Sequence, residues 1–167
     1  MDIKFNKISD FKRGILYDLL FDAYSFGKNY ITNDSKENFR KNDNFFFDNL
    51  DIADRCGFIT TLKDDVIGFI CWDPRNMPEY AIIGDNCIIS KYKGRGYGKL
   101  QLREAINRIT QDFAKKIFVS TDSILTPAQK MYESVGFIRL DNSMLEQWQI
   151  SQKQDIHYGL EISRNMI

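Results

Sequence analysis

The sequence has little of what several protein classes require. Its 167 residues include one histidine and three cysteines, and 23 basic residues balance 23 acidic ones. This balance argues against general nucleic-acid binding, which needs a basic surface to displace counterions from phosphates. Three scattered cysteines are too few for a disulfide framework, and one histidine without clustered cysteines predicts no metal site. Cys71 and Cys87 lie in apolar runs, so we expect small buried hydrophobes rather than nucleophiles.

Long apolar runs and long linkers are missing as well. The opening MDIKFNKISD has no apolar signal core, and no stretch is long enough to span a bilayer. We therefore expect a cytoplasmic protein that does not bind membranes. Because proline is scarce and the length fits one domain, we expect a single domain over residues 1–167.

The apolar spacing that is present predicts a mixed α/β domain. GFITTL and VIGFICW, separated by a polar turn, indicate an antiparallel hairpin. Helical spacing starts at Ser9, where Ser9 or Asp10 would cap the helix. The order strand, loop, helix, strand from Ala81 to Ser120 favours parallel strands joined by a right-handed crossover. The other expected elements are a first strand near 3–8, a helix within 35–50 and closing strands at 137–140 and 156–162.

Three alternating glycines lie between a strand and an amphipathic helix, at Gly94, Gly96 and Gly98. Glycine lets a ligand approach the backbone closely, and the N-terminus of a helix attracts anions. Lys93, Arg95 and Lys99 add positive charge. The loop therefore favours a phosphate or pyrophosphate, with a plain tight turn as the alternative. The spacing is not that of a dinucleotide fingerprint, and Leu100 stands where a P-loop needs Ser or Thr.

A second segment, AQKMYESVGF, predicts a short helix, and the residues around it include signals for both of its ends. Thr126 is expected to be the N-cap, with Pro127 in the first turn and Gln129 completing a capping box. Gly136 is expected to end the helix in a left-handed conformation, and Phe137 to pack back on it.

These two segments in this order resemble the GNAT superfamily of N-acetyltransferases. IISKYKGRGYGKLQ resembles its coenzyme A-binding segment, and AQKMYESVGF resembles its later A-x-x-x-Y-x-x-x-G-F segment. The resemblance covers nearly the whole chain. It implies a mixed, mostly antiparallel twisted sheet of about six to seven strands, about four helices, and fourth and fifth strands that splay apart. Three positions depart from the usual pattern: Lys93 replaces Arg or Gln, Ser90 replaces Pro and Leu125 replaces Asn.

The resemblance also implies where acetyl-coenzyme A, the co-substrate, would bind. Its pantetheine arm would lie along the exposed backbone of the fourth strand, and its pyrophosphate on the glycine loop. The residues implied in cofactor binding are Cys87, Ile88, Ile89, Lys93, Gly94, Arg95, Gly96, Tyr97, Gly98, Lys99 and Ala128.

The resemblance makes Tyr132 the candidate acid, because it matches the family tyrosine that faces the coenzyme sulfur. Its alternative role is that of a packed helix aromatic. Asp85 interrupts an apolar strand and is a candidate base, or else a polar group at a strand edge or bulge. An amine that arrives neutral would need no protein base.

The acceptor is expected to be a small-molecule or peptide amine, which the sequence does not specify further. A catalytically silent coenzyme A-binding or regulatory module on the same fold is the alternative, and a nucleotide-binding protein is a third. Because related proteins are often dimers, the resemblance allows a homodimer.

Overall fold

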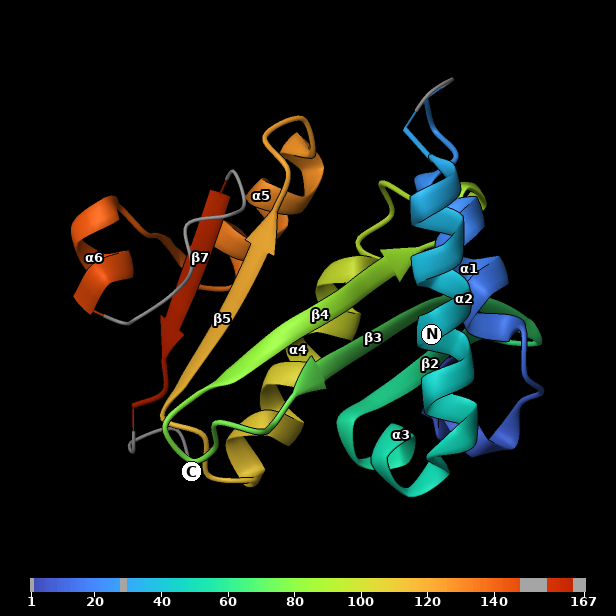
Figure 1. Ribbon diagram of the computed structural model, residues 1–167, viewed down its shortest axis with the longest axis horizontal. Helices are drawn as coiled ribbons and strands as arrows, with labels where there is room; N and C mark the ends of the chain where they lie inside the picture. Colours follow the sequence, from blue (N-terminus) through green and yellow to red (C-terminus); the bar gives the residue numbers. More distant parts are fainter. Residues whose placement is uncertain (1, 28–29, 148–155, 164–167) are drawn as a thin grey trace. The chain divides into compact units, whose positions relative to one another are not determined.

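The computed structural model describes residues 2–27, 30–147 and 156–163, which fall into two compact units (Figure 1). The first unit comprises Met1–Trp72 and Asp85–Ala105, and the second comprises Asp73–Gly84 and Ile106–Ile167. β4 (Ala81–Ile88) and α4 (Tyr97–Gln111) contribute to both. Strands of the described residues follow the order β1-β2-β3-β4-β5-β7-β6 in one seven-stranded sheet. A single domain over residues 1–167 stays a prediction.

The other elements follow the same division. The first unit contains β1 (Ile3–Asn6), the 3-10 helix η1 (Ile8–Asp10), α1 (Ile15–Tyr24), α2 (Asn33–Asp48), α3 (Leu50–Cys56), β2 (Gly57–Leu62), nearly all of β3 (Asp65–Asp73) and the 3-10 helix η2 (Ser90–Tyr92). The second contains β5 (Lys116–Thr121), α5 (Thr126–Ser134), β6 (Ile138–Arg139), α6 (Asn142–Gln147) and β7 (Ile156–Glu161).

The predicted mixed α/β fold class is confirmed, with seven strands in the described ranges. Six α-helices occur in these ranges, against about four predicted. The short α3 and α6 account for the difference, because one or two helical turns are too few to show a helical period in the sequence. In the part of the chain that the structure describes, no helix has the length and apolar character needed to cross a membrane.

β2 and β3 form the predicted antiparallel hairpin. Their register runs from Gly57 opposite Cys71 to Leu62 opposite Asp65, and Lys63 in the turn has a left-handed φ of 54°. β1 pairs antiparallel with the outer edge of β2. The hairpin therefore forms where the alternating apolar pattern and the polar turn predict it.

Helices cover both faces of the sheet in the first unit. One core cluster joins α1, α2 and α3 to the sheet, with members that include Leu16, Leu20, Phe46, Ala53, Ile59, Phe69, Cys71 and Cys87. Side chains alternate between the faces of a strand. On the opposite face, the buried Gln101 side chain of α4 meets Thr60 of β2 at 2.6 Å.

α1 starts later than the sequence pattern predicts. Ser9 and Asp10 lie in η1, and α1 begins directly after Gly14 with no side-chain cap from its N-cap residue. The buried Asp43 carboxylate of α2 instead accepts hydrogen bonds from the N–H groups of Gly14 (2.8 Å) and Leu16 (3.0 Å). Asp43, which is distant in the sequence, therefore caps the N-terminus of α1 in place of the expected Ser9 or Asp10.

β4 and β5 form the parallel pair of the second unit, as the strand–helix–strand order predicts. The pairing runs from Ala81 opposite Ile117 to Ile83 opposite Val119. The rest of β4 belongs to the first unit, so the splay of the two strands stays a prediction. β5 and β7 pair antiparallel over six residue pairs, and β6 pairs antiparallel with the far edge of β7.

The predicted capping box of α5 is wrong. Leu125 is the N-cap, so Thr126 already lies inside the helix, and no side chain caps this end. The Gln129 amide instead donates to the carbonyls of Asp122 (3.3 Å) and Ser123 (2.9 Å) in the preceding loop. It satisfies loop carbonyls rather than the N–H groups of the helix end.

The predicted end of α5 is confirmed. Gly136 has a positive φ of 101°, and the N–H of Phe137 donates to the Tyr132 carbonyl at 3.2 Å. The Phe137 ring lies 5.8 Å from the Tyr132 ring, centre to centre. This contact fixes the Tyr132 side chain at the end of its helix.

Candidate active site

The glycine loop leads directly into the first turn of α4. Gly94 and Gly96 have φ values of 73° and 85°, which other L-residues rarely adopt. A Cβ atom at either glycine would have no heavy atom within 4 Å, so the space beside both is open. α4 begins at Tyr97, and its first N–H groups have no partners within the helix. The loop therefore offers an open backbone site for an anion.

The cations of this loop have different surroundings. The Lys93 ammonium donates to the Ala23 carbonyl in the last turn of α1 and lies 5.1 Å from the centre of the Phe26 ring. Desolvation here lowers the pKa of Lys93. The Arg95 guanidinium lies 5.6 Å from the Tyr92 ring. Lys93 therefore fastens the loop to α1, at the position where the resemblance leads us to expect Arg or Gln.

The segment before the glycines is hydrogen-bonded to α1 and to the first residue of β3. The N–H of Ser90 donates to the Asp22 carboxylate at 2.5 Å. Lys91 pairs with Asp65 at 2.9 Å, and the Tyr92 hydroxyl donates to the same carboxylate. The Tyr92 and Lys91 contacts lower the pKa of Asp65. Proline has no N–H and could not make the hydrogen bond to Asp22, which explains why Ser90 stands where the family pattern has Pro.

Asp85 lies half-buried in β4 and receives a hydrogen bond from the Asn42 amide of α2. Burial raises the pKa of Asp85 to about 6, and the Asn42 hydrogen bond opposes that rise. A carboxylate of this pKa is mostly ionised at neutral pH and is a stronger base than an ordinary aspartate. The role of Asp85 as a base, rather than as a polar group at a strand edge or bulge, stays a prediction.

Cys71 and Cys87 are buried beside Asp85, as the apolar runs predict. Burial raises the pKa of both thiols, and the charge of Asp85 adds to the effect. The thiolate is the nucleophilic form of cysteine, so neither side chain is poised to attack at neutral pH.

Two main-chain groups predicted to lie along the pantetheine arm already have partners within the first unit. The N–H of Ile89 donates to the Ile67 carbonyl at 2.9 Å, and the Cys87 carbonyl accepts from Gln101 at 3.2 Å. The Ile88 side chain is buried with Ile67 and Tyr92. These contacts fix the backbone of β4 where it enters the glycine loop.

Gln101 lies beside the strand predicted to bind the pantetheine arm, and the sequence patterns did not single it out. Its side chain is fully buried, and its amide nitrogen donates to the Phe69 carbonyl (3.0 Å), to Asn86 (2.8 Å) and to the Cys87 carbonyl. Its oxygen accepts from the Thr60 hydroxyl. The sequence does contain a signal for this buried amide, because Gln101 is a polar residue on the apolar side of α4, one turn before Ala105.

Gly68 of β3 makes room for this amide. A Cβ at position 68 would lie 2.6 Å from the Gln101 oxygen and 2.6 Å from the Cys87 carbonyl oxygen. Only glycine permits so close an approach, and glycine inside an apolar strand run was a second signal. Asn42 was missed as well, because one amide on a polar helix carries no sequence signal.

Tyr132 and Ala128 belong to the second unit, apart from the residues above. Tyr132 is buried in α5, and its ring lies 5.8 Å from that of Tyr158. The Tyr158 hydroxyl donates to Glu133 at 2.9 Å. Ala128 lies half-buried in the first turn of α5. Asp85, the β4 backbone and the glycine loop lie together in the first unit, and the position of Tyr132 relative to them stays a prediction.

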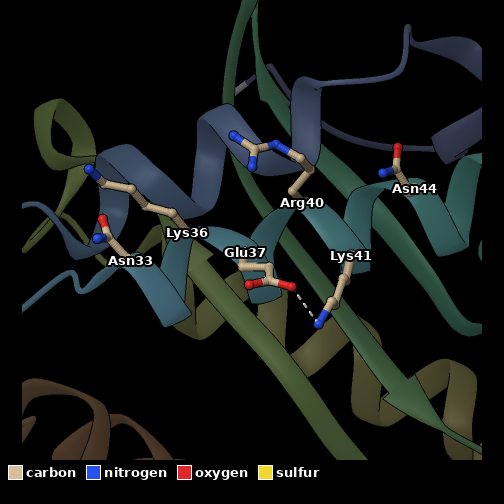
Figure 2. Close-up of a pocket in the computed structure, with 6 residues that line it drawn as sticks. All are labelled: Asn33, Lys36, Glu37, Arg40, Lys41 and Asn44. Carbon is tan, nitrogen blue, oxygen red and sulfur yellow. Dashed lines mark ion pairs between the residues drawn. The ribbon is translucent and has the colours of Figure 1, made fainter.

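The outer side of α2 carries a separate, open cavity of about 600 Å³ (Figure 2). It is lined by Asn33, Lys36, Glu37, Arg40, Lys41 and Asn44. Glu37 pairs with Lys41 at 2.8 Å, as the dashed line in Figure 2 marks. Lys36 and Arg40 lie over the rings of Phe21 and Tyr17 of α1. These contacts brace α2 against α1.

Comparison with known proteins identifies the class of protein that these features define. The sequence model described as the acetyltransferase (GNAT) family matches residues 15–137, which is well over half of the chain. The chain therefore belongs to the GNAT family of acetyltransferases. No curated protein sequence matches it.

Solved structures with the same fold extend over almost the whole chain. The PaiA N-acetyltransferase from Thermoplasma acidophilum, in complex with coenzyme A, has a TM-score of 0.75 and 15% identity over 97% of this chain and 100% of that one. A GNAT acetyltransferase from Staphylococcus aureus Mu50 scores 0.71, with 16% identity over 96% and 99%. One from Elizabethkingia anophelis with acetyl-coenzyme A bound scores 0.63, with 18% identity over 96% and 99%. At these identities the likeness shows the fold.

Proposed function

We propose that this protein transfers an acetyl group from acetyl-coenzyme A to a primary amine, which attacks the thioester directly in a ternary complex. The glycine loop carries the proposal, because it is an open backbone anion site at the start of α4 in a chain of the GNAT family. The structures from Thermoplasma and Elizabethkingia contain coenzyme A and acetyl-coenzyme A, which supports the same donor here.

In this proposal most of the residues that bind the donor belong to the first unit. The N–H groups from Gly94 to Gly98 bind the pyrophosphate, and Arg95 and Lys99 add positive charge. The β4 backbone around Ile88, between the Cys87 carbonyl that accepts from Gln101 and the Ile89 N–H that donates to Ile67, bonds to the pantetheine amides. Ala128 contributes from the start of α5. Holding donor and acceptor in register supplies much of the rate, since well-oriented reactants can gain several powers of ten.

The transfer forms a bond between the amine nitrogen and the acetyl carbon and breaks the bond between that carbon and sulfur. Asp85 accepts the proton that the nitrogen loses, and Tyr132 donates a proton to the departing sulfur. Asp85 then releases its proton to solvent, and solvent restores the Tyr132 hydroxyl. Each proton transfer by a placed side chain contributes about 10²–10⁴-fold.

A panel of amines tests the proposed function through release of free coenzyme A thiol. We expect turnover with at least one primary amine, and binding of acetyl-coenzyme A by calorimetry. Turnover with any amine rules out the silent binding module, whereas wild-type protein without calorimetric binding contradicts the proposal.

Gly96→Glu tests the loop, because it places a bulky anion where the pyrophosphate would lie. We expect loss of acetyl-coenzyme A binding with the fold retained by circular dichroism. Gly14→Glu is the matched control, since Gly14 also has a positive φ, 101°, and open space around its Cβ position. It should cost similar backbone strain and leave binding intact. Equal loss in both variants would remove the loop from the site.

Tyr132→Phe tests the acid. Turnover should fall while the affinity for acetyl-coenzyme A changes little, because only the hydroxyl is removed. Tyr158→Phe is the control, since it deletes a neighbouring hydroxyl that is bonded to Glu133. Unchanged turnover in Tyr132→Phe would leave this residue as a packed aromatic.

A further inference from the structure

Asn42 occupies a position on α2 that its neighbours hold rigidly. The next residue, Asp43, is buried and accepts two hydrogen bonds from the start of α1. One turn further, the Phe46 ring packs edge-on against Phe69 of β3 at 5.9 Å. The residue after Asn42 thus attaches α2 to α1, and Phe46, one turn further along, attaches it to the sheet, so the helix backbone at Asn42 is held in place.

That amide donates to the Asp85 carboxylate of β4. A neutral N–H donor orients a carboxylate and stabilises its charged form without neutralising it. A lysine or arginine at this position would form an ion pair instead and would weaken Asp85 as a base. The chemistry of an amide therefore suits a base that must stay charged and available.

Two buried thiols also interact with Asp85. From β3 the Cys71 thiol interacts with it, and from β4 the Cys87 thiol, both kept protonated by burial. Cys87 in turn interacts with the charges of Lys93 and of Asp22 of α1. Burial and the Asn42 hydrogen bond act on the pKa of Asp85 in opposite directions.

We propose that Asn42 is a positioning residue for the acetyl transfer, which holds the Asp85 carboxylate in the orientation and charge state that a base requires. This inference rests on the proposed function for its consequence in catalysis. The contact itself can be tested without turnover. Asn42 thereby makes α2 part of the catalytic machinery through a hydrogen bond to β4.

The test compares Asn42→Leu with Asn38→Leu. Leucine keeps the approximate size of asparagine and removes the donor. Asn38 is exposed one turn earlier on the same helix, which makes it the matched control. Asn42→Ser, which keeps a shorter donor, gives a second variant if leucine disturbs folding. The readouts are an NMR titration of the Asp85 carboxyl carbon and the pH dependence of kcat/KM.

We expect the wild-type titration and the acidic limb of kcat/KM to have midpoints near pH 6. In Asn42→Leu both should move upward, because the charged form loses its donor. The loss of kcat/KM should be at least about threefold greater at pH 6 than at pH 8.5. Asn42→Ser should shift less, and Asn38→Leu should follow the wild type.

Titration curves that coincide in the wild type and in Asn42→Leu would overturn the proposal. An equal rate loss at both pH values would do the same, since it would mark Asn42 as merely structural. If the titration shifts but no amine in the panel supports turnover, the coupling between Asn42 and Asp85 stands and the acetyl-transfer function falls. The two failures are therefore distinguishable.

Discussion

Polar side chains in opposite electrostatic states lie at the two faces of β4, one on the strand itself and one on α4. On the face toward α2, the Asp85 carboxylate lies among buried thiols, and burial raises its pKa to about 6. On the face toward α4, the Gln101 amide is buried deeper still, yet both of its ends are hydrogen-bonded. The Asp85 carboxylate, whose charged form is disfavoured by burial, therefore lies on one side of the strand. The Gln101 amide, whose polar atoms are hydrogen-bonded, lies on the other.

This difference suggests separate roles for the two side chains, reactivity for Asp85 and structural support for Gln101. A buried group whose charged form is disfavoured gains reactivity at the expense of stability. A buried amide with all its partners fixes the strands around it, and losing it leaves those partners unsatisfied. Substitutions on the two faces should therefore change stability in opposite directions.

Asp85→Asn should have the largest effect. Turnover should fall by about 10²–10⁴-fold if Asp85 is the base. Stability should rise at neutral pH, because the folded pKa of about 6 lies above the ordinary 3.8 and the folded state therefore disfavours the charge. The destabilising contribution of Asp85 grows between those two pH values and is complete above pH 6. Removing it should add about 1–3 kcal/mol to the free energy of unfolding at pH 7.

Steady-state kinetics and urea denaturation at pH 7 and pH 3.5 check this. At pH 3.5 the stability gain should largely disappear, because Asp85 is then protonated in the folded state. A variant that is less stable than the wild type at pH 7 would contradict the assignment of Asp85 as a destabilised charge.

Gln101→Leu should act in the opposite direction. It leaves the Thr60 hydroxyl and the Phe69 and Cys87 carbonyls without their partner, which should cost about 2–4 kcal/mol in the free energy of unfolding. Urea denaturation measures the loss. Gln111→Leu, at the exposed end of α4, is the control and should stay within about 0.5 kcal/mol. Equal stabilities would show that the network does not hold the strands.

The sequence predicts the parts of this fold that depend on short-range patterns. The β2–β3 hairpin, the parallel β4–β5 pair and the left-handed end of α5 all follow from alternation, element order and a glycine. The glycine loop falls where predicted for the same reason. The hairpin and the end of α5 are encoded by neighbouring residues, whereas the β4–β5 pair follows from the order of three successive elements between Ala81 and Thr121.

The features that sequence patterns miss depend on partners distant in the chain. The N-terminus of α1 is capped by Asp43, 27 residues from Leu16, and Asn42 lies 43 residues from Asp85. In the sequence, Gln101 is a polar residue on the apolar side of α4 with no evident reason. The structure supplies the reason, because Thr60 and two main-chain carbonyls are its hydrogen-bond partners. Long-range hydrogen bonds leave no period in the sequence, so only the folded structure reveals them.

Ser90→Pro extends the comparison to the end of β4 and should have a smaller effect. It restores the residue that the family resemblance leads us to expect but removes the N–H that donates to Asp22. We expect a loss of about 1–2 kcal/mol in the free energy of unfolding and weaker binding of acetyl-coenzyme A. Ser90→Ala keeps the N–H and should be close to the wild type. Equal behaviour of both variants would show that this hydrogen bond does not anchor the loop.

Cys87→Ala should have the smallest effect, although Cys87 shares its face of the strand with Asp85. Its thiol is buried and its pKa is raised, so it should take no part in an acyl-enzyme. Turnover should remain within about threefold of the wild type, and removing one buried sulfur should cost about 1 kcal/mol of stability. Intact-protein mass spectrometry after incubation with acetyl-coenzyme A should show no acetylated cysteine in the wild type. A stable acetyl adduct on Cys87, or loss of turnover in Cys87→Ala, would contradict direct attack by the amine. Cys87 would then be the nucleophile of a two-step route through an acetylated enzyme.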